Sequence, residues 1–345
     1  MKLFEQIRNH QTYIIAEMSA NHAGSIDTAK EIIWAAKEAG ADCLKIQTYT
    51  ADTLTLDCNN EYFQIRSGLW KGETFYRLYG RAYTPWEWQA ELKEETEKAG
   101  MDFLSTPFDH TAVDFLEGLG VEFYKIASFE LVHIPLIRYI ASKGKPIIMS
   151  TGMGTLAEID EAVRTIREQG NEQIVLLRCA TAYPAITDEM NLATLRNMAE
   201  TFGVPVGLSD HSAGSIGAVT AVALGASVIE KHFCLSRDID SADAAFSMEP
   251  GEFASMVRNI RQTEKAIGVV KYGPAPQEMS SVQKRRSVFC SRDIKAGEAF
   301  TEDNIKVVRP GAGLHPRYYD LLLGKSACID IKKGTPIKFG MFKSS

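Results

Sequence analysis

The feature that most constrains this chain is a regular alternation of short apolar segments with longer segments of helical pattern, from about residue 12 to residue 270. The short segments are rich in β-branched residues, and several follow a helical segment that ends at a glycine such as Gly40 or Gly225. The eight strands predicted in this way are Tyr13–Ala16, Cys43–Gln47, Asp102–Ser105, Phe123–Ile126, Pro146–Met149, Ile174–Cys179, Val206–Leu208 and Val228–His232. Because their positions are almost continuously apolar, the pattern indicates parallel strands covered by helices.

Eight strand–helix units in this length match a closed (β/α)8 TIM barrel, the α/β fold that we predict for residues 1–270. A doubly wound open sheet is the alternative arrangement of the same units. A barrel brings the C-terminal ends of all its strands to one rim, where the catalytic groups of this fold lie. Polar residues do follow several of the predicted strands.

A second, smaller domain is predicted after the alternation ends. Residues 271–286, KYGPAPQEMSSVQKRR, are rich in proline, glycine, serine and charge, which is typical of a linker. Within residues 287–345, Asp293-Ile294-Lys295-Ala296-Gly297 recurs as Asp330-Ile331-Lys332-Lys333-Gly334. The repeat indicates two similar turns in a small, pseudo-symmetric, β-rich fold. A domain of roughly 60 residues has only a marginal core, so we expect it to rest against something larger.

Charge and cysteine usage narrow the possible functions. Acidic residues outnumber basic ones by 44 to 38, for a formal charge of −6, so neither nucleic acid nor an anionic membrane is an expected partner. The six cysteines form no C-x-x-C pair, which favours the reducing cytoplasm over an export route with disulfides. Charge near the N-terminus leaves no signal-length apolar stretch. The uncharged run 212–229 contains three glycines and is predicted to be a buried helix followed by a strand.

Two histidines occupy matching positions on neighbouring predicted strands. His211 follows the seventh strand, and His232 ends the eighth. Adjacent strands lie about 4.8 Å apart, so the two imidazoles could share one divalent ion. A histidine taken alone is more often structural than functional, and it is the matched positions that favour a shared role. Without a third obvious ligand, such an ion would keep positions open for water or substrate, as a Lewis-acid metal does.

Two lysines are predicted to point into the mouth of the barrel. Lys45 and Gln47 lie two residues apart on the second strand and therefore share a face, and a lysine is poorly suited to the face that packs on helices. Lys125 ends the fourth strand, and Glu17 ends the first. Two lysines at one mouth indicate an anion site, whereas lysine–carboxylate bridges such as Lys45 with Glu17 are the structural alternative. Glu17 could also orient water or take up a proton.

Hydroxyl groups follow three other strands, in Ser105-Thr106-Pro107, Ser150-Thr151-Gly152 and Ser209-Asp210. Hydroxyl and backbone donors beside small residues suit phosphate or carboxylate oxygens. Any one of them could instead cap the helix that follows it. Their common position around the two lysines favours a phosphorylated anion as the ligand.

Ten motifs, in order over nearly the whole chain, resemble those of one enzyme family. They are IIAEMSANHAG, KIQTYTADTLTL, STPFD, YKIASFE, IMSTGM, CATAYPA, GLSDH, GASVIEKHF and AFSMEP, with Val308-Arg309-Pro310-Gly311 in the tail. They resemble the sialic acid synthase family, and most closely its pseudaminic acid branch. The tail resembles the SAF (antifreeze-like, β-clip) domain that such synthases carry after their barrel.

The resemblance implies that phosphoenolpyruvate condenses with water and a linear amino-sugar aldehyde, 2,4-diacetamido-2,4,6-trideoxy-altrose, to give pseudaminic acid and phosphate. It implies that phosphoenolpyruvate is bound by Lys45, Thr106, Lys125, Ser128, Ser150 and Ser209. It implies that the sugar is contacted by Gln47, Glu130, Tyr183, Asp243 and Arg309, and that His211 and His232 bind manganese or magnesium. The residues expected to be catalytic are Glu17, Lys45, Lys125, Glu130, Glu230 and Asp243. Arg309 would act across a domain-swapped homodimer, and flagellin or a surface glycan would receive the product.

The sequence departs from the family pattern at two places. Ala180 stands where the family often has a hydroxyl residue. Residues 236–245 lack the usual Gly-Pro before the sugar-site aspartate, so Asp240 and Asp243 are both candidates for that role. The spacing to the motif that ends at Pro250 favours Asp243.

The mechanism that this resemblance supports is a metal-assisted condensation. The ion would polarise the aldehyde, C3 of phosphoenolpyruvate would attack it, and water positioned by Glu17 would capture C2. A synthase for N-acetylneuraminic or legionaminic acid is the alternative within the family, and residues 68–74 and 83–86 resemble the pseudaminic branch instead. A metal-dependent lyase or hydrolase on the same barrel is a further alternative, because a fold does not choose its chemistry.

Overall fold

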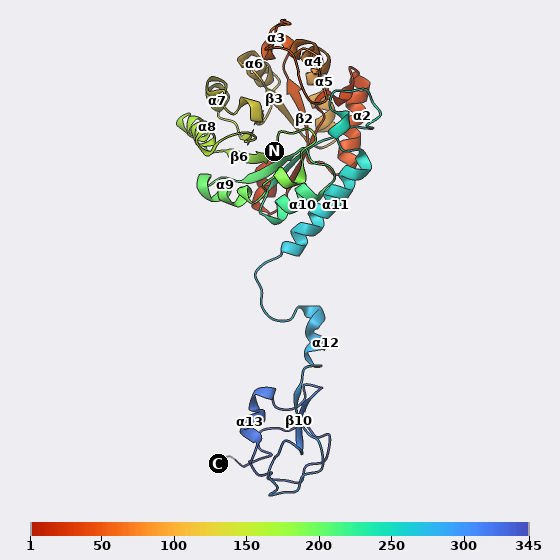
Figure 1. The fold of residues 1–345 in the computed structure, drawn as a ribbon, viewed down its shortest axis with the longest axis vertical. Coiled ribbons are helices and arrows are strands. Elements are labelled where there is room, and N and C mark those ends of the chain that lie inside the picture. Colours follow the sequence, from red (N-terminus) through yellow and green to blue (C-terminus); the bar gives the residue numbers. More distant parts are fainter. Residues whose placement is uncertain (1, 344–345) are drawn as a thin grey trace. The chain divides into compact units, whose positions relative to one another are not determined.

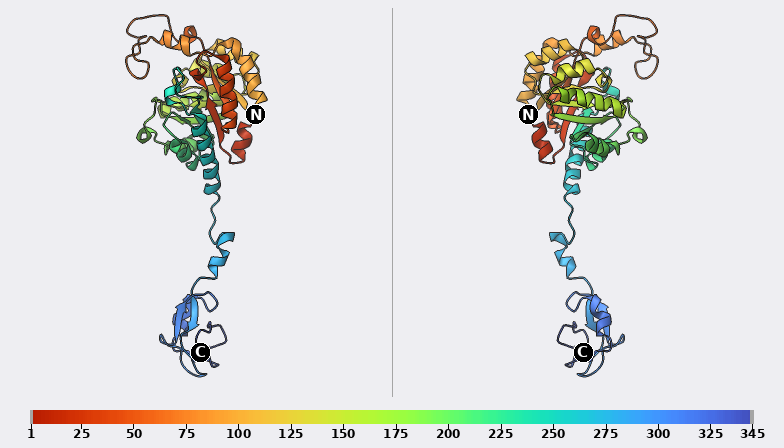
Figure 2. Two further views of the ribbon diagram at one scale, coloured as in Figure 1. Left: turned by 90° about the vertical axis from the view of Figure 1, so that its right-hand side faces the viewer. Right: turned by 90° about the vertical axis from the view of Figure 1, so that its left-hand side faces the viewer.

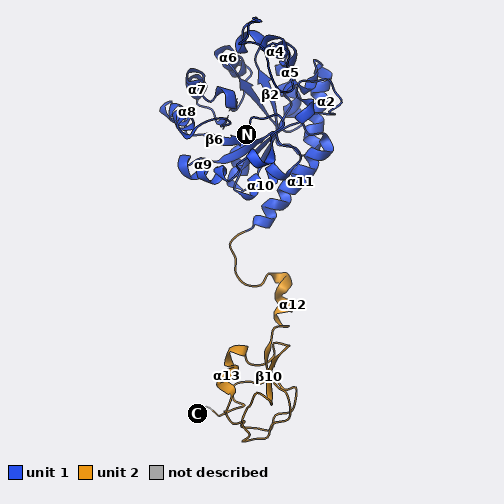
Figure 3. Cartoon of the chain, viewed as in Figure 1, with its two compact units in different colours: residues 1–268 blue, residues 269–345 orange. Residues whose placement is uncertain are grey.

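The computed structural model describes residues 2–343, and the chain divides into two compact units, residues 1–268 and 269–345 (Figure 3). The first unit is a parallel sheet with helices around it (Figure 1). Its strands are β1 Tyr13–Glu17, β2 Cys43–Thr48, β3 Asp102–Pro107, β4 Tyr124–Ile126, β5 Ile147–Ser150, β6 Ile174–Cys179, β7 Val206–Asp210 and β8 Val228–His232. The strand order is β3-β2-β1-β8-β7-β6-β5-β4, and β3 also packs against β4, so the sheet closes on itself. The predicted (β/α)8 barrel is therefore confirmed, and the open doubly wound sheet is wrong.

Several strands continue further than the apolar pattern predicted. β3 extends to Pro107, β5 to Ser150 and β7 to Asp210, whereas β4 and β5 each begin one residue later than expected. The added residues are mostly polar. The hydrogen bonds between strands continue into the rim, whereas the apolar residues that the sequence pattern detects end inside the barrel. The polar side chains at this rim are therefore held by regular backbone.

The α-helices of the first unit alternate with the strands along the chain, except that α1 precedes β1 and three helices lie between β2 and β3. They are α1 Leu3–Arg8, α2 Ile26–Glu38, α3 Ala51–Leu54, α4 Phe75–Ala82, α5 Trp86–Lys98, α6 His110–Gly118, α7 Ile134–Ala141, α8 Leu156–Glu168, α9 Thr194–Phe202, α10 Ile216–Ala223 and α11 Pro250–Ile267. Local signals start them: the Ser25 side chain accepts from the Thr28 backbone N–H ahead of α2, and Thr155 and Glu158 form a capping box at α8. The segment between α3 and α4 projects from the barrel as a long loop (Figure 2).

The uncharged run 212–229 forms α10 and the start of β8, as predicted. Among residues 2–343, no helix has the length and apolar character needed to cross a membrane.

The barrel interior is apolar at one end and polar at the other. Ile15, Cys43, Leu104, Phe123, Ile148, Val175, Leu177 and Val228 form a buried cluster inside the barrel, which Leu3 of α1 joins. A strand repeats its facing every two residues, so the positions two further along these strands also face inward. Those positions are Glu17, Lys45, Thr106, Lys125, Ser150, Cys179 and Glu230. The polar residues of the rim thus stand directly above an apolar floor.

The second unit contains a two-stranded antiparallel sheet, β9 Ser287–Cys290 with β10 Ile305–Val308, and a short helix α13 Tyr319–Leu322. Its core includes Val288, Phe300 and Ile337. The two copies of the sequence repeat pair with each other reciprocally. Lys295 Nζ lies 2.8 Å from Asp330, Lys332 Nζ lies 2.7 Å from Asp293, and Ile294 bridges Ile331.

The segment predicted as a linker, residues 271–286, is partly helical. It contains a 3-10 turn, Pro276–Glu278, and the one-turn helix α12, Met279–Val282. Pro276 starts the turn, because proline suits the first position of a helix, and Glu278 accepts from the Ala275 backbone N–H at 2.6 Å. A proline of the predicted linker therefore begins a 3-10 turn, and α12 follows it directly.

Candidate active site

The centre of the rim is a buried cluster of two lysines and two carboxylates. The Lys45 ammonium forms ion pairs with Glu17 and with Glu230, whose Oε1 is 3.0 Å away. Lys125 Nζ lies 3.5 Å from the same Glu230 oxygen. The sheet register explains the meeting, since Glu17 pairs with Lys45 across β1 and β2. The lysines thus share a mouth, and the lysine–carboxylate bridges considered from the sequence are present as well.

The two carboxylates of this cluster have opposite pKa shifts. Burial raises the pKa of Glu17 to about 7, against the opposing effect of Lys45. Burial also acts to raise the pKa of Glu230, but Lys125 and Lys45 outweigh it and hold that pKa at about 2. Glu230 is therefore a permanent anion between two lysines, while Glu17 exchanges its proton near neutrality.

Hydroxyl groups surround the lysines at the ends of β3, β4, β5 and β7. Lys125 Nζ donates to Ser150 Oγ at 2.6 Å, and Ser209 Oγ donates to Glu230 Oε1 at 3.3 Å. Ser128 Oγ accepts from the Gly152 backbone N–H at 3.1 Å. Thr106 Oγ1 is buried and has no hydrogen-bond partner within residues 2–343. An unpaired buried hydroxyl on the inward face of the rim is suited to an anionic ligand's oxygen.

The two predicted metal ligands, His211 and His232, lie side by side at the ends of β7 and β8. Their ring centroids are 5.3 Å apart. Burial lowers the pKa of both, so both imidazoles are neutral near pH 7, which is the form that ligates metals. His211 Nδ1 lies 3.0 Å from the Ala180 carbonyl oxygen, and His232 Nδ1 is buried without a partner in the described chain.

These features fit a divalent cation held by two imidazoles and completed by water or substrate. In the part of the chain that the structure describes, no group of three or more His, Cys, Asp or Glu side chains is arranged to hold a metal. A site with more protein ligands is therefore not formed by these residues.

The predicted sugar contacts lie around the same mouth. Burial raises the pKa of Glu130 to about 7, and its Oε2 is buried without a partner among the described residues. Asp243 is buried, and its Oδ2 accepts from the Ala20 backbone N–H at 3.3 Å, whereas Asp240 is exposed. Gln47 is half-buried on the inward face of β2. The geometry thus favours Asp243 over Asp240.

Aromatic side chains line this region, and one of them, Phe246, had no role predicted from the sequence. The Tyr183 ring lies 4.4 Å from that of His211, and Phe246 lies 5.0 Å from Tyr183 and 4.9 Å from His232. Trp70, from the long loop after α3, lies 6.2 Å from Tyr183 and donates to the Ala242 carbonyl at 3.1 Å. Phe246 stands in the motif AFSMEP, which is the only sequence signal that could have drawn attention to it.

Arg309 is the one predicted site residue outside the barrel unit. It follows β10 in the second unit, where it is exposed. Its contact with the sugar stays a prediction.

A parallel barrel whose rim combines buried lysines, hydroxyl donors and paired imidazoles defines an enzyme that handles a small anionic substrate. The chain belongs to the NeuB family, whose model matches residues 32–272, and a SAF domain matches residues 285–343. It is 46% identical to the pseudaminic acid synthase of Campylobacter jejuni over 98% of this chain and 100% of that protein. It is 44% identical to the pseudaminic acid synthase of Helicobacter pylori over 94% of this chain and 96% of that protein. A crystal structure of N-acetylneuraminic acid synthetase from Leptospira borgpetersenii is 31% identical, with a TM-score of 0.69, over 79% of this chain and 90% of that one.

Proposed function

We propose that this protein is a pseudaminic acid synthase. It condenses phosphoenolpyruvate with 2,4-diacetamido-2,4,6-trideoxy-altrose and water, and it releases phosphate. The observation that carries the proposal is the joint presence of the buried Lys45 and Lys125 ammonium groups and the His211 and His232 imidazoles at one rim. The full-length similarity to two pseudaminic acid synthases supports this choice among the family's possible products.

Phosphoenolpyruvate is assigned to the lysine and hydroxyl cluster. Lys45 and Lys125 neutralise its carboxylate and phosphate charges, and the hydroxyls supply directed donors. Thr106 is the most telling of these, because its hydroxyl is buried and has no partner in the described chain. The hydroxyl donors in this assignment are Thr106, Ser128, Ser150 and Ser209.

The sugar is assigned to the side of the rim where Asp243, Glu130, Tyr183 and Gln47 lie, with Arg309 reaching it from a partner subunit. His211 and His232 would hold manganese or magnesium, and a cation bound there would polarise the aldehyde carbonyl. Glu130, with one buried unpaired oxygen, is suited to accept hydrogen bonds from a hydroxyl or acetamido group.

The chain's own residues account for the proton and charge movements. As C3 of phosphoenolpyruvate bonds to the aldehyde carbon, positive charge develops at C2, and the Glu230 carboxylate stabilises it. Water then adds to C2 and gives a proton to Glu17, whose pKa of about 7 makes it a suitable base. Collapse of the tetrahedral adduct forms the C2 ketone and expels phosphate, which carries away the proton of the C2 hydroxyl, while the former aldehyde oxygen takes up the proton that Glu17 received from water. Lys45 and Lys125 balance the charge of the departing phosphate.

The finer setting of the enzyme belongs to the same proposal. A homodimer in which the SAF domain of one subunit covers the barrel of the other would bring Arg309 to the sugar. A cytoplasmic location fits a substrate such as phosphoenolpyruvate, and flagellin or a surface glycan would receive the product.

The test is incubation of the purified protein with phosphoenolpyruvate, manganese and a panel of 2-acetamido hexoses that can open to the linear aldehyde. We expect phosphate release and a nine-carbon α-keto acid, detected by mass spectrometry, only with the diacetamido-trideoxy-altrose. Preference for N-acetylmannosamine or for the legionaminic precursor would replace the proposed product. Phosphate release without any aldehyde would overturn the condensation itself.

The metal assignment has its own measurement. His232→Ala is expected to lose high-affinity manganese binding, seen by electron paramagnetic resonance, by about 100-fold or more. His10→Asn, at an exposed position between α1 and the start of β1 and therefore at the opposite strand end from the two histidines, serves as the control. Unchanged manganese binding by His232→Ala would exclude this histidine as a ligand.

A further inference from the structure

The loop that joins β8 to α11, residues 233–249, carries two groups of the candidate site, Asp243 and Phe246. Asp243 directly precedes the 3-10 turn Ala244–Phe246, and Phe246 is its last residue. A turn of this length does not fix a side chain by itself. The position of the Asp243 carboxylate therefore depends on whatever holds the loop.

Asn21, in the 3-10 turn Ser19–His22 between β1 and α2, holds this loop through its side chain. Its side chain is fully buried. Nδ2 donates to the Phe233 carbonyl oxygen at 2.9 Å and to Ser247 Oγ at 2.8 Å, and Oδ1 accepts from Ser241 Oγ at 2.7 Å. One amide thus contacts the beginning, the middle and the end of the loop.

The contacts of Asn21 continue directly to Asp243. Ser247 Oγ donates to the Asp243 carbonyl oxygen at 2.7 Å, and the Asp243 backbone N–H donates to Ser241 Oγ at 3.3 Å. The two serines that contact Asn21 therefore hold the backbone of Asp243 from both sides. The Asp243 carboxylate also accepts from the backbone of Ala20, the neighbour of Asn21.

An amide is the side chain that this arrangement requires. The pattern needs two N–H donors and one acceptor on a short side chain, and asparagine supplies them. Aspartate has the same shape but no donor, and its charge would face the Phe233 carbonyl oxygen. Because the site is fully buried, unpaired groups there cannot turn to water instead.

We propose that Asn21 is a positioning residue for the sugar substrate. It keeps the β8–α11 loop in the one conformation that presents Asp243 to the sugar and the Phe246 ring to the two imidazoles. This inference rests on the proposed function in so far as Asp243 is a sugar contact. The residues assigned to phosphoenolpyruvate lie on or directly after β2, β3, β4, β5 and β7, whereas Asn21 follows β1 and the loop follows β8.

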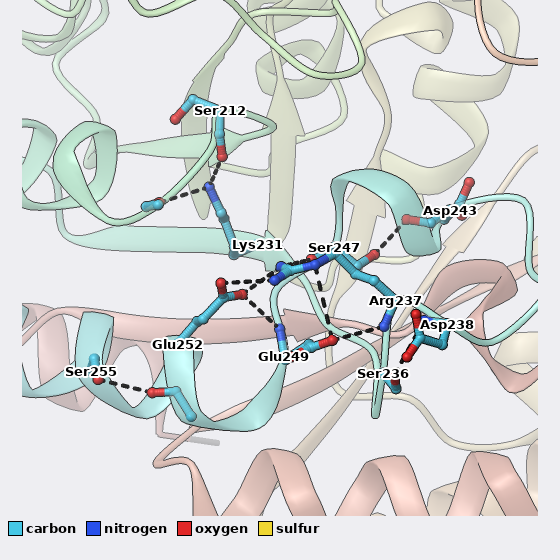
Figure 4. Close-up of polar contacts among 12 residues, drawn as sticks. Ser212, Lys231, Ser236, Arg237, Asp238, Asp243, Ser247, Glu249, Glu252 and Ser255 are labelled. Carbon is cyan, nitrogen blue, oxygen red and sulfur yellow. Dashed lines mark hydrogen bonds and ion pairs between the residues drawn. The ribbon is translucent and has the colours of Figure 1, made fainter.

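A second clamp holds the same loop from outside and provides a comparison. Arg237 forms a bidentate ion pair with Glu252 of α11, at 2.6 and 2.9 Å, and donates to the Ser247 carbonyl oxygen at 3.2 Å (Figure 4). This pair is partly exposed, and exposed ion pairs contribute little. Weakening the Arg237–Glu252 ion pair changes how Arg237 holds the loop, but it leaves the hydrogen bonds of the Asn21 amide intact.

The experiment compares Asn21→Asp, Glu252→Gln and Asn171→Asp in the full-length enzyme. Asn171 is a matched control, since it is a buried asparagine whose side chain bonds Lys145 and Gln173 at the other end of the strands. For Asn21→Asp we expect KM for the sugar to rise about tenfold or more, with KM for phosphoenolpyruvate within about twofold of wild type. Glu252→Gln and Asn171→Asp are expected to leave both KM values within about twofold.

Hydrogen exchange measured by mass spectrometry gives a readout that does not depend on turnover. Peptides covering residues 233–249 should exchange faster in Asn21→Asp than in wild type, while peptides of β2, β4 and β6 should not. If Asn21→Asp does not fold, Ser241→Ala breaks the same network from the loop side. It removes the donor to Asn21 Oδ1 and the acceptor of the Asp243 backbone N–H, and it leaves the β1–α2 turn unchanged. The same split between the two KM values is expected for it.

Two results would overturn the proposal. One is an equal rise of both KM values in Asn21→Asp, and the other is unchanged exchange of residues 233–249. If instead the wild-type enzyme consumes no sugar of the panel, the proposed function fails. The exchange of the loop would then still decide whether Asn21 anchors it.

Discussion

Among single residues, Glu17 and Glu230 show how one cluster produces two kinds of carboxylate. Both are fully buried, so burial alone would raise both pKa values. Glu230 lies between Lys45 and Lys125, whereas Glu17 has Lys45 and the negative charge of Glu230 for neighbours. The resulting pKa values, about 7 for Glu17 and about 2 for Glu230, separate a proton acceptor from a fixed charge.

The raised pKa of Glu130 predicts that the free energy of unfolding depends on pH. Burial raises its pKa in the folded protein from the ordinary 4.5 to about 7. The unfolded chain therefore releases this proton at lower pH than the folded protein does, and stability falls as pH rises from about 4.5 to about 7. Glu130→Gln should remove this loss and raise the free energy of unfolding at pH 8 by at most about 2 kcal/mol, with no gain below pH 4.5.

Urea unfolding at pH 4.5 and pH 8 measures this difference. Glu158→Gln, at an exposed capping position of α8, is a comparison that removes an acid without a raised pKa. An equal effect of Glu130→Gln at both pH values would show that the carboxyl is already ionised in the folded state.

At the scale of elements, neighbouring residues of a strand face opposite sides of the sheet, so residues that face the site alternate with residues that face the surrounding helices. Ser209 and Glu230 face inward, whereas their neighbours Asp210 and Lys231 form a pair at 2.8 Å with almost no exposed surface. Asp210 accepts from the Ser212 backbone and hydroxyl, and Lys231 donates to the carbonyls of Ser212 and Gly214. This pair fixes the backbone that flanks the two histidines, and Figure 4 shows Lys231 pointing to Ser212.

Lys231→Met tests this pair. It leaves the Asp210 carboxylate buried and uncompensated, so we expect a loss of about 3 to 5 kcal/mol in the free energy of unfolding. Urea denaturation measures the loss. The double variant Lys231→Met with Asp210→Leu should lose less than the single variant, because no buried charge remains. A double variant that is less stable than Lys231→Met would argue that the pair itself supplies the stability.

At the scale of the whole molecule, the predicted action of Arg309 in trans can be tested by mixing two inactive variants. Lys45→Ala is expected to inactivate a barrel, and Arg309→Ala is expected to inactivate a SAF domain. If each barrel uses its partner's SAF domain, a mixed dimer has one fully intact site. Unfolding and refolding the two variants together should restore about one quarter of wild-type activity, because about half of the dimers are mixed and each has one working site.

Separately refolded variants provide the control and should stay inactive. No recovery in the mixture, with dimers shown by light scattering, would place Arg309 with its own barrel or away from the site.

The sequence by itself determined the barrel, its strands and the inward position of Lys45 and Lys125. These follow from the two-residue period of strands and from the cost of placing a lysine against apolar helices. The motif spacing also selected Asp243, which is buried, over Asp240, which is exposed.

What only the tertiary structure decided is which groups share a contact. The shared position of Glu230 between two lysines, the packing of Phe246 on both imidazoles and the hold of Asn21 on a loop more than 200 residues away arise from closure of the sheet. Closure brings β1 beside β8, and no local pattern in the chain encodes that neighbour.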